Sequence, residues 1–375
     1  MLDKKLNERK SLGNLRSMNF TGEGVDFLSN DYLGLARSEA LRQNIETTFL
    51  QLNEAIKING STGSRLLSGN HKYAEELEHS LAKIFMAEAA LIFNSGYNAN
   101  LSILSCVPTK ADTIIHDELI HASLIDGARL SFAKRRSFRH NDLNDLEKKL
   151  RSAQGQKFVV VESIYSMDGD ACPLQELVVL CEQHGAYIIV DEAHSTGLWG
   201  NDGNGLACES NLQEKIFARI YTFGKGMGVH GACICGSQLL KDYLINFARP
   251  FIYTTAMPLH SFVSIACAFE YIQSNGQPRK SLFENISIFK QGFLANNKSS
   301  IPLLLPSNSA IQIISTSGNE HAKNVAEQMR ANNFEVRAIL APTVKSGQER
   351  LRICLHAYNT KKEIDDFMIN LTELL

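Results

Sequence analysis

The sequence lacks the features that mark membrane proteins, secreted proteins and nucleic-acid-binding proteins. No stretch approaches the ~18 consecutive apolar residues of a membrane span. The charged segment Met1–Lys10 has no apolar core of the kind that a secretory signal needs. The net charge is −2, so broad electrostatic binding to nucleic acid or to an anionic membrane is not expected. We therefore expect a cytoplasmic protein with neither kind of partner.

Paired cysteines are also missing. The eight cysteines are scattered, none forms a Cys-x-x-Cys pair, and several lie in apolar runs such as Cys233-Ile234-Cys235. Thiols distributed in this way are typical of buried, reduced cysteines in a reducing compartment. We expect neither disulfides nor a metal site.

The chain does contain enough residues for two cores, because 375 residues is long for a single one. From about residue 71 to 236, short apolar strands alternate with amphipathic helices. Strands that are apolar throughout and separated by helices predict an α/β fold with a mostly parallel sheet covered on both faces. The predicted strands are Ala90–Phe93, Thr113–Ile115, Phe158–Glu162, Ala186–Val190, Ala218–Tyr221 and Ala232–Cys235. The predicted helices are His71–Met86, Asn98–Leu104, His121–Leu130 and Leu174–His184.

The character of the sequence changes after about residue 260. Ile311–Ile314, Glu335–Ile339 and Leu351–Leu355 are predicted strands, and His321–Asn332 and Lys361–Leu375 are predicted helices. We therefore predict an N-terminal arm over 1–40, a large α/β domain over 41–260 and a small α+β domain over 261–375. The one basic cluster, Lys134-Arg135-Arg136 with Arg139-His140, is short and is interpreted as a solvated turn.

The ends of two predicted strands carry the residues most indicative of chemistry. Ala186–Val190 leads into Asp191-Glu192-Ala193-His194, and Ala218–Tyr221 leads into Thr222-Phe223-Gly224-Lys225. In a parallel sheet such ends lie at the edge where ligands bind. A pyridine cofactor with a phosphate tail needs this set: a lysine for the Schiff base and for proton transfer, and an acid that keeps the ring nitrogen protonated. The alternative is a strand-end acid with an unrelated surface lysine.

Four weaker signals accompany this pair. Ser95-Gly96-Tyr97 follows a strand and opens a helix, which is a suitable phosphate site, although many such turns carry glycine for steric reasons alone. His121 at a helix start could stack on a flat ring or merely cap the helix. Ser166 could donate to a cofactor oxygen or satisfy a turn. Arg352 could bind a substrate carboxylate or form a surface ion pair.

The tetrapeptide Asp191-Glu192-Ala193-His194 also has a rival interpretation, since it is a signature of one class of helicases, where it holds magnesium. Those enzymes need an upstream G-x-x-x-x-G-K-[ST] loop for the phosphates. The sequence has no such loop, and Gly224-Lys225 lies downstream, so this interpretation is disfavoured.

Taken together, these motifs resemble those of the α-oxoamine synthases, which are fold-type-I enzymes dependent on pyridoxal phosphate. The resemblance covers nearly the whole chain. It rests on Ser29–Ala36, Gly60–Gly69, Ser95-Gly96-Tyr97, His121-Ala122-Ser123-Leu124, His140-Asn141-Asp142, Ser166–Asp170, Asp191–Gly197, Thr222–Gly226 and Ala248–Pro258.

The resemblance implies a role for individual residues. Lys225 would be the Schiff-base lysine and proton-transfer base, and Asp191 would pair with the pyridine nitrogen. His121 would stack on the ring, with Ala193 on the other face. The remaining implied cofactor contacts are His194 and Ser166 at the phenolic oxygen, Gly96, Tyr97 and Thr222 at the phosphate, and Thr254 or Thr255 at the phosphate of the partner in a homodimer. The implied substrate contacts are Arg16, His121, Thr343 and Arg352.

The resemblance also implies a reaction. The members most similar to this chain condense L-alanine with a pimeloyl thioester in biotin biosynthesis, with loss of carbon dioxide. The acyl group could be carried by coenzyme A or by an acyl carrier protein. Sister enzymes with the same cofactor residues instead join glycine to acetyl or succinyl thioesters, or serine to a palmitoyl thioester. A catalytically retired regulatory subunit is the alternative from a different class, and the joint presence of Lys225, Asp191, His121 and His194 argues against it.

Overall fold

A computed structural model describes the chain except for residues 1, 16–17, 19–21, 297–303, 317 and 342. Its contacts divide the chain into two compact units, which we treat separately. The large unit comprises Leu33–Ser166 and Ala171–Gly276, and the small unit comprises Met1–Tyr32, Met167–Asp170 and Gln277–Leu375. The domain boundaries predicted near residues 40 and 260 stay predictions.

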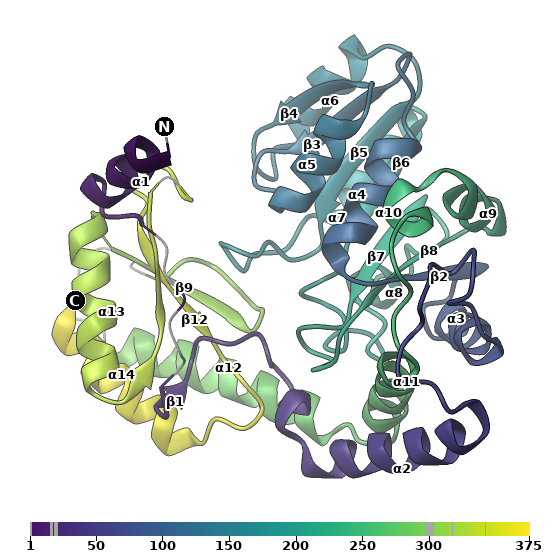
Figure 1. Cartoon of the computed structure of the whole chain (residues 1–375). Coiled ribbons are helices and arrows are strands. Elements are labelled where there is room, and N and C mark those ends of the chain that lie inside the picture. Colours follow the sequence, from purple (N-terminus) through teal and green to yellow (C-terminus); the bar gives the residue numbers. More distant parts are fainter. Residues whose placement is uncertain (1, 16–17, 19–21, 297–303, 317, 342) are drawn as a thin grey trace. The chain divides into compact units, whose positions relative to one another are not determined.

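A seven-stranded sheet forms the centre of the large unit, with the strand order β2-β8-β7-β6-β5-β3-β4 (Figure 1). Strands β3 to β7 run parallel to one another, and β8 is antiparallel to both of its neighbours. The predicted α/β fold with a mostly parallel sheet is therefore confirmed. The strands are β2 (Ala89–Phe93), β3 (Thr113–Asp117), β4 (Lys134–Phe138), β5 (Lys157–Glu162), β6 (Ala186–Asp191), β7 (Ala218–Thr222) and β8 (Ala232–Gly236).

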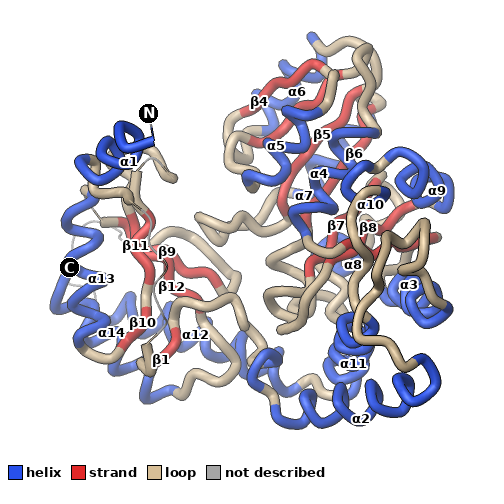
Figure 2. The backbone as a smooth tube through the Cα atoms, viewed as in Figure 1, coloured by secondary structure: helices blue, strands red, loops and turns tan. Residues whose placement is uncertain are grey.

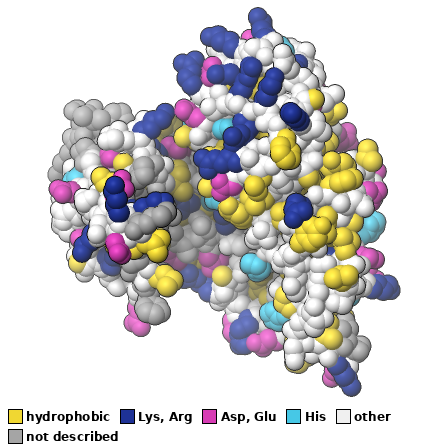
Figure 3. Space-filling model, turned by 45° about the horizontal axis from the view of Figure 1, so that its top comes forward, with side chains coloured by type: hydrophobic (Ala, Val, Ile, Leu, Met, Phe, Trp, Pro, Cys, Tyr) yellow, Lys and Arg dark blue, Asp and Glu magenta, His cyan; other side chains and the backbone are white. Residues whose placement is uncertain are grey.

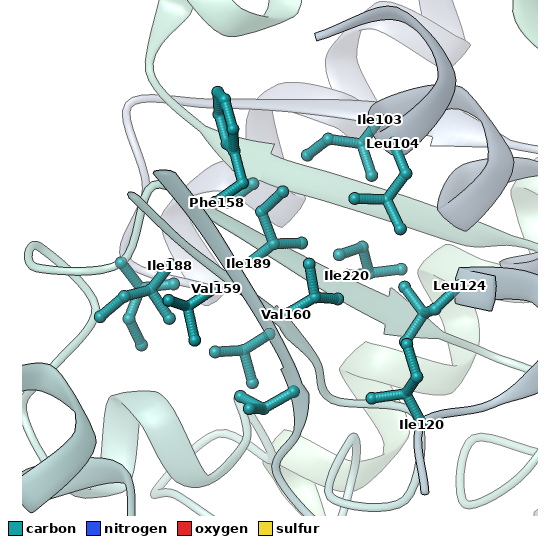
Figure 4. Packing of buried hydrophobic residues seen from close by; sticks show 14 of the residues in the cluster. Ile103, Leu104, Ile120, Leu124, Phe158, Val159, Val160, Ile188, Ile189 and Ile220 are labelled. Carbon is teal, nitrogen blue, oxygen red and sulfur yellow. The ribbon is translucent and has the colours of Figure 1, made fainter. Parts of the chain in front are cut away.

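Helices pack on this sheet and close its core. Figure 4 shows side chains of α4 and α5 directed toward Val160, Ile189 and Ile220 of three neighbouring strands, and all of these side chains are buried. Burial of this kind is the dominant favourable contribution to folding. The helices of the large unit are α2 (Glu39–Ile56), α3 (Lys72–Ile84), α4 (Gly96–Cys106), α5 (Ala122–Leu130), α6 (Leu143–Ser152), α7 (Leu174–Gln183), α8 (Leu206–Glu209), α9 (Gln238–Phe247), α10 (Arg249–Ile252) and α11 (Leu259–Ser274), with the 3-10 turn η1 (Leu35–Arg37).

The interpretation of the basic cluster as a turn is wrong. Lys134, Arg135 and Arg136 belong to β4, which lies at one edge of the sheet. Figure 3 shows Lys and Arg side chains over the surface of this unit. Four of the five residues of this strand are polar, so the sequence has no apolar alternation that would predict a strand here. Charged side chains at the edge of a sheet prevent the edge strand from pairing with another chain.

The small unit contains a three-stranded antiparallel sheet with the order β11-β12-β9 (Figure 2). The strand predicted over Glu335–Ile339 is broken at Val336, because its two halves pair with different partners. The strands are β1 (Val25–Asp26), β9 (Ile311–Ser315), β10 (Phe334–Glu335), β11 (Arg337–Ile339) and β12 (Arg350–Cys354), and β1 pairs with β10 in parallel. The helices are α1 (Leu2–Ser11), α12 (Gln277–Asn296), α13 (Asn319–Ala331) and α14 (Lys361–Leu374).

Helix α14 illustrates how the sequence sets an element of this unit. It begins at a capping box in which Thr360 and Glu363 satisfy each other's backbone N–H groups. Its predicted apolar face is buried at Ile364, Phe367 and Met368.

All eight cysteines of the chain are free thiols. Among the described residues, none of the helices combines the length and apolar character needed to cross a membrane.

Candidate active site

The predicted cofactor residues of the large unit gather where its parallel strands end. Asp191 is the last residue of β6, and Thr222 is the last residue of β7. His121 is the N-cap of α5, and Gly96 is the first residue of α4. Each position lies at the end of a strand or in the segment that follows one, as expected for the ligand-binding edge of such a sheet.

Lys225 and His194 form the first close pair at this edge. Lys225 lies three residues beyond β7, and its Nζ is 2.9 Å from Nε2 of His194. The histidine is buried and the lysine half-buried. An amine and an imidazole in hydrogen-bond contact can exchange a proton, which is the capacity that a proton-transfer base requires.

Asp191 lies at one end of a buried hydrogen-bond chain. Its Oδ2 accepts from Asn100 Nδ2 at 2.7 Å, and its Oδ1 accepts from the backbone N–H of Ala193 at 2.9 Å. Asn100 Nδ2 is also 2.9 Å from Ser123 Oγ, which lies 2.7 Å from Nδ1 of His121. The chain therefore links the acid to the predicted stacking histidine and orients both.

Asn100 and Ser123 are site residues that the sequence reasoning missed. Ser123 belongs to the motif His121-Ala122-Ser123-Leu124, in which only His121 was given a role. Asn100 lies one helical turn after Gly96 on α4. Their approach depends on Gly127 of α5, where an added Cβ would lie 2.8 Å from the carbonyl oxygen of Asn100. The signal in the sequence was therefore a polar residue on the inner face of a helix beside a glycine-containing neighbour.

The imidazole ring of His121 is held by a hydrogen bond at Nδ1, although the residue is exposed. The other atom of this bond is Oγ of Ser123. Partial burial of the ring lowers the pKa of His121; the carboxylate of Asp191 opposes that shift and the charge of Lys225 reinforces it. The imidazole is thus available as a flat surface on which a ring could stack.

The start of α4 and the end of β7 form the predicted phosphate site. Helix α4 begins at Gly96, earlier than predicted, so the N–H groups of Gly96 and Tyr97 belong to its first turn, where helices offer donors to anions. Gly96 packs against the methyl group of Thr222, and a Cβ at Gly96 would collide with it. The Thr222 hydroxyl is buried and has no hydrogen-bond partner among the described residues. It is available for a bound group.

The other predicted cofactor residues have different surroundings. Ser166 is buried in the loop after β5. The backbone carbonyl of Thr255 accepts a hydrogen bond of 2.9 Å from Nδ2 of Asn94, directly beyond β2. Thr255 is exposed and Thr254 half-buried.

The acid in the middle of the rival helicase motif faces away from the site. Glu192 is fully buried and accepts hydrogen bonds from the backbone N–H groups of Leu206 and Ala207 at 3.1 and 2.7 Å, and from Ser195 Oγ. It therefore fixes the start of α8. Within the described ranges, no group of three or more His, Cys, Asp or Glu side chains is placed to hold a metal ion.

The predicted substrate residues lie in the small unit. Arg352 on β12 is buried; its Nη2 donates to Asn30 Oδ1 at 3.0 Å, and its Nη1 contacts Cys354 Sγ at 2.9 Å. Burial opposes its charge, but Cys354 and Tyr32 raise the pKa of Arg352 on balance. Thr343 is exposed in the turn after β11, with its N–H bonded to Leu340 O. Arg16 lies outside the described residues.

These residues fit pyridoxal phosphate. The unpartnered Thr222 hydroxyl and the first turn of α4 suit its phosphate, and buried Asp191 suits its ring nitrogen. The exposed His121 suits its ring face, and the Lys225 amine suits its aldehyde. One edge of one sheet provides all four functions.

Comparison with known proteins points the same way. Residues 23–370 match the family model "Aminotransferase class I and II". An 8-amino-7-oxononanoate synthase of Emericella nidulans is 40% identical over 364 residues, covering 92% of this chain and 87% of that protein. The serine palmitoyltransferase of S. paucimobilis, solved with a bound PLP–myriocin aldimine, has a TM-score of 0.89 at 25% identity, covering 100% of this chain and 96% of that one. The 8-amino-7-oxononanoate synthase of Francisella tularensis has a TM-score of 0.79 at 29% identity, covering 94% of this chain and 97% of that one.

The sheet and its strand-end site define a fold-type-I enzyme dependent on pyridoxal phosphate. The chain belongs to the aminotransferase class I and II family and, within it, to the α-oxoamine synthases. It is an enzyme that transfers acyl groups with this cofactor, so the family and the cofactor expected from the sequence are confirmed.

Proposed function

We propose that the chain catalyses the reaction of an 8-amino-7-oxononanoate synthase: the condensation of L-alanine with a pimeloyl thioester, with loss of carbon dioxide, in biotin biosynthesis. The supporting observation is the 40% identity to the Emericella nidulans enzyme of that name across 92% of this chain. The thiol carrier would be coenzyme A or an acyl carrier protein.

Bound pyridoxal phosphate supplies an electron sink that stabilises negative charge on the α-carbon of an amino acid. In the large unit, Thr222 and the first turn of α4, at Gly96 and Tyr97, would hold the phosphate. Asp191 would hold a proton on the ring nitrogen, and its two hydrogen-bond donors keep it in place for that task.

Lys225 would remove the α-proton of alanine at its Nζ. Its neighbour His194, at 2.9 Å, would help to hold the amine in position and, together with Ser166, would contact the phenolic oxygen. His121 would cover one face of the ring and Ala193 the other, which excludes water from the reacting carbon.

In the small unit, Arg352 would bind the alanine carboxylate through its planar guanidinium group. Asn30 and Cys354 hold that group from behind, so the arginine is oriented before substrate arrives. Thr343 and Arg16 would contact substrate. Arg16 would bind the acyl donor, because the carboxylate at the far end of a pimeloyl chain can pair with a cationic side chain.

We also propose a cytoplasmic homodimer. The sequence resemblance implies that Thr254 or Thr255 reaches the phosphate of the partner subunit, which would make the site incomplete in a single chain. The mass of the purified protein in solution, measured by light scattering, tests the dimer: the mass of one 41.6 kDa chain would contradict it.

Two sister activities remain the alternatives for the substrates. Serine palmitoyltransferase is favoured by the structural similarity of that enzyme, at a TM-score of 0.89 but 25% identity. Glycine acetyltransferase shares the cofactor residues by family resemblance. A regulatory subunit without activity would not need the linked set of Lys225, His194 and Asp191.

The test is a matrix of substrates with the purified holoenzyme. Alanine, glycine and serine are each combined with pimeloyl-coenzyme A, pimeloyl carrier protein, and acetyl-, succinyl- and palmitoyl-coenzyme A. Thiol release is followed, and the amino ketone is identified by mass spectrometry. We expect the highest kcat/KM for alanine with a pimeloyl donor; a higher value for glycine with acetyl-coenzyme A, or for serine with palmitoyl-coenzyme A, would overturn the proposal.

A further inference from the structure

Glu78 is a buried acid of the large unit that has no part in the proposed function. It lies on α3, and its side chain is 1% exposed. Its Oε1 is 2.9 Å from Nη1 of Arg65 and accepts a hydrogen bond of 3.1 Å from the backbone N–H of Ile92 on β2. Its Oε2 is 2.9 Å from Nζ of Lys241 on α9. One carboxylate thus joins β2, α9 and the chain before α3.

Arg65 extends this link into residues 60–69, which we call the glycine loop. Its Nε donates to Oδ1 of Asn70 at 2.7 Å, and its Cζ lies 5.8 Å from the centroid of the Phe262 ring. The arginine side chain is 10% exposed. Because a guanidinium group is planar and rigid, contacts at two of its nitrogen atoms and over an aromatic ring fix its orientation. The carboxylate of Glu78 therefore anchors the middle of the glycine loop.

The glycine loop is bonded in turn to residues 254–258, which we call the threonine segment. Oγ of Ser61 donates to the carbonyl oxygen of Met257 at 2.6 Å. The carbonyl oxygen of Gly63 accepts a hydrogen bond of 2.9 Å from the backbone N–H of Ala256. The position of the threonine segment therefore depends on the position of the glycine loop.

The backbone of the glycine loop depends on its surroundings for its conformation. Thr62 has a φ of 54°, in the left-handed region that β-branched residues rarely adopt. A Cβ at Gly69 would lie 2.5 Å from the carbonyl oxygen of Gly63 and 2.6 Å from Cβ of Ala256, so the loop closes tightly on the threonine segment. Strained backbone of this kind persists only where the surrounding structure holds it. The anchor at Arg65 supplies such a hold.

The threonine segment carries Thr254 and Thr255, one of which is proposed to reach the cofactor phosphate of the partner subunit. The carbonyl oxygen of Thr255 also accepts a hydrogen bond of 2.9 Å from Nδ2 of Asn94. We propose that Glu78 is a positioning residue for cofactor binding: through Arg65 and the glycine loop, it fixes the threonine segment where it contacts that phosphate. This inference rests on the homodimer and on the threonine contact of the proposed function.

The experiment measures the apparent Kd for pyridoxal phosphate by titrating the cofactor-depleted protein and following the visible absorption of the bound cofactor. Thr254→Val and Thr255→Val each remove one hydroxyl group and keep the shape of the side chain. Because a hydrogen bond to a charged group is worth about tenfold in Kd or more, we expect one of these two variants to raise Kd by that factor. Glu78→Leu and Arg65→Met should raise Kd about tenfold as well, since each breaks the link to the glycine loop.

Lys241 provides a matched control on the same carboxylate. It pairs with the other oxygen of Glu78 and lies on α9, outside the glycine loop. Lys241→Met should lower the thermal stability of the protein and leave Kd within about threefold of wild type, because the bond from Arg65 to Glu78 remains. A Kd raised as much in Lys241→Met as in Arg65→Met would show a general loss of stability and overturn the proposal.

A double variant tests the route from the acid to the phosphate. Glu78→Leu is combined with the threonine variant that weakens cofactor binding. Because both changes act on one phosphate contact, the second should raise Kd by less than about twofold beyond the first. Full multiplication of the two effects would overturn the proposal. If Glu78→Leu does not fold, Arg65→Met breaks the same link from the other side and takes its place.

The outcomes also separate this proposal from the proposed function. A raised Kd in one threonine variant, with Glu78→Leu and Arg65→Met equal to wild type, would overturn the role of Glu78 and leave the phosphate contact standing. An unchanged Kd in both threonine variants would overturn the phosphate contact itself and, with it, the role of Glu78. Because no amino acid or thioester is used, these results do not depend on which substrates the enzyme joins.

Discussion

The two units hold their predicted functional residues in different ways. In the large unit the predicted residues lie at or just beyond strand ends and are joined by short contacts, a half-buried one from Lys225 to His194 and buried ones from Asp191 through Asn100 to Ser123. In the small unit, Arg352 lies within a strand, and the amide that orients it, Asn30, lies 322 residues earlier in the chain. In the proposed function, chemistry at the cofactor is thus assigned to residues of neighbouring strands, whereas recognition of the carboxylate is assigned to residues from the two ends of the chain.

This difference separates two kinds of expected failure. Damage to the strand-end set should abolish turnover, because we propose that its members act on the cofactor itself. Damage around Arg352 should weaken substrate binding and leave the cofactor in place. Spectra of the cofactor and the division of effects between kcat and KM can therefore distinguish the two regions.

The largest effect is expected for Lys225→Ala. The variant lacks the amine that we propose both to link to the cofactor and to remove the α-proton, so kcat should fall by ~10³-fold or more. The visible band of the lysine-linked cofactor should disappear as well. Lys215→Ala, at an exposed lysine paired with Glu182, should change neither quantity. An unaltered band in Lys225→Ala would show that the cofactor is attached elsewhere.

Asp191→Asn should have the next largest effect. An amide of equal size can occupy the same space, but it cannot keep the ring nitrogen protonated, so kcat should fall by ~10²–10³ while the cofactor still binds. Asn100→Ala, which removes one donor to Asp191, should lower kcat less. Activity of Asp191→Asn within about threefold of wild type would contradict the role of the carboxylate.

The same contrast explains what the sequence could predict. Lys225, Asp191 and His194 each lie within four residues after an apolar run, so strand positions and the rule for ligand-binding edges were sufficient to group them. Asn100 and Ser123 lie on helices, and their contact depends on the packing of α4 against α5 at Gly127, which periodicity does not report. Asn30 was visible as part of a motif, but its contact with Arg352 joins distant segments, and no local pattern encodes that pairing.

Arg352→Lys tests the small unit. Lysine retains the charge but loses the planar pair of donors, so the KM for alanine should rise about tenfold or more with little change in the cofactor spectrum. Asn30→Ala should raise the same KM by a smaller factor, because it removes the amide that orients the guanidinium group. The double variant should be less than additive, since both changes act on one carboxylate contact. A fall in kcat with KM unchanged would place Arg352 among the residues of the chemical step.

The smallest expected effect is a change in the stability of the protein with pH. It distinguishes Glu162 from Asp191, the acid beside it on the neighbouring strand. The pKa of Glu162 is raised from 4.5 to about 8 by burial, with a further contribution from Asp191. The folded protein therefore keeps a proton that the unfolded chain releases above 4.5, so unfolding releases a proton and the free energy of unfolding falls as pH rises from 4.5 to about 8. Glu162→Gln has no such proton. The difference in Tm between Glu162→Gln and wild type should consequently grow in favour of glutamine across this range and level off above it. Calorimetry of the apo protein at a series of pH values measures the trend, and a difference in Tm that stays constant with pH would show that Glu162 is ionised in the folded protein.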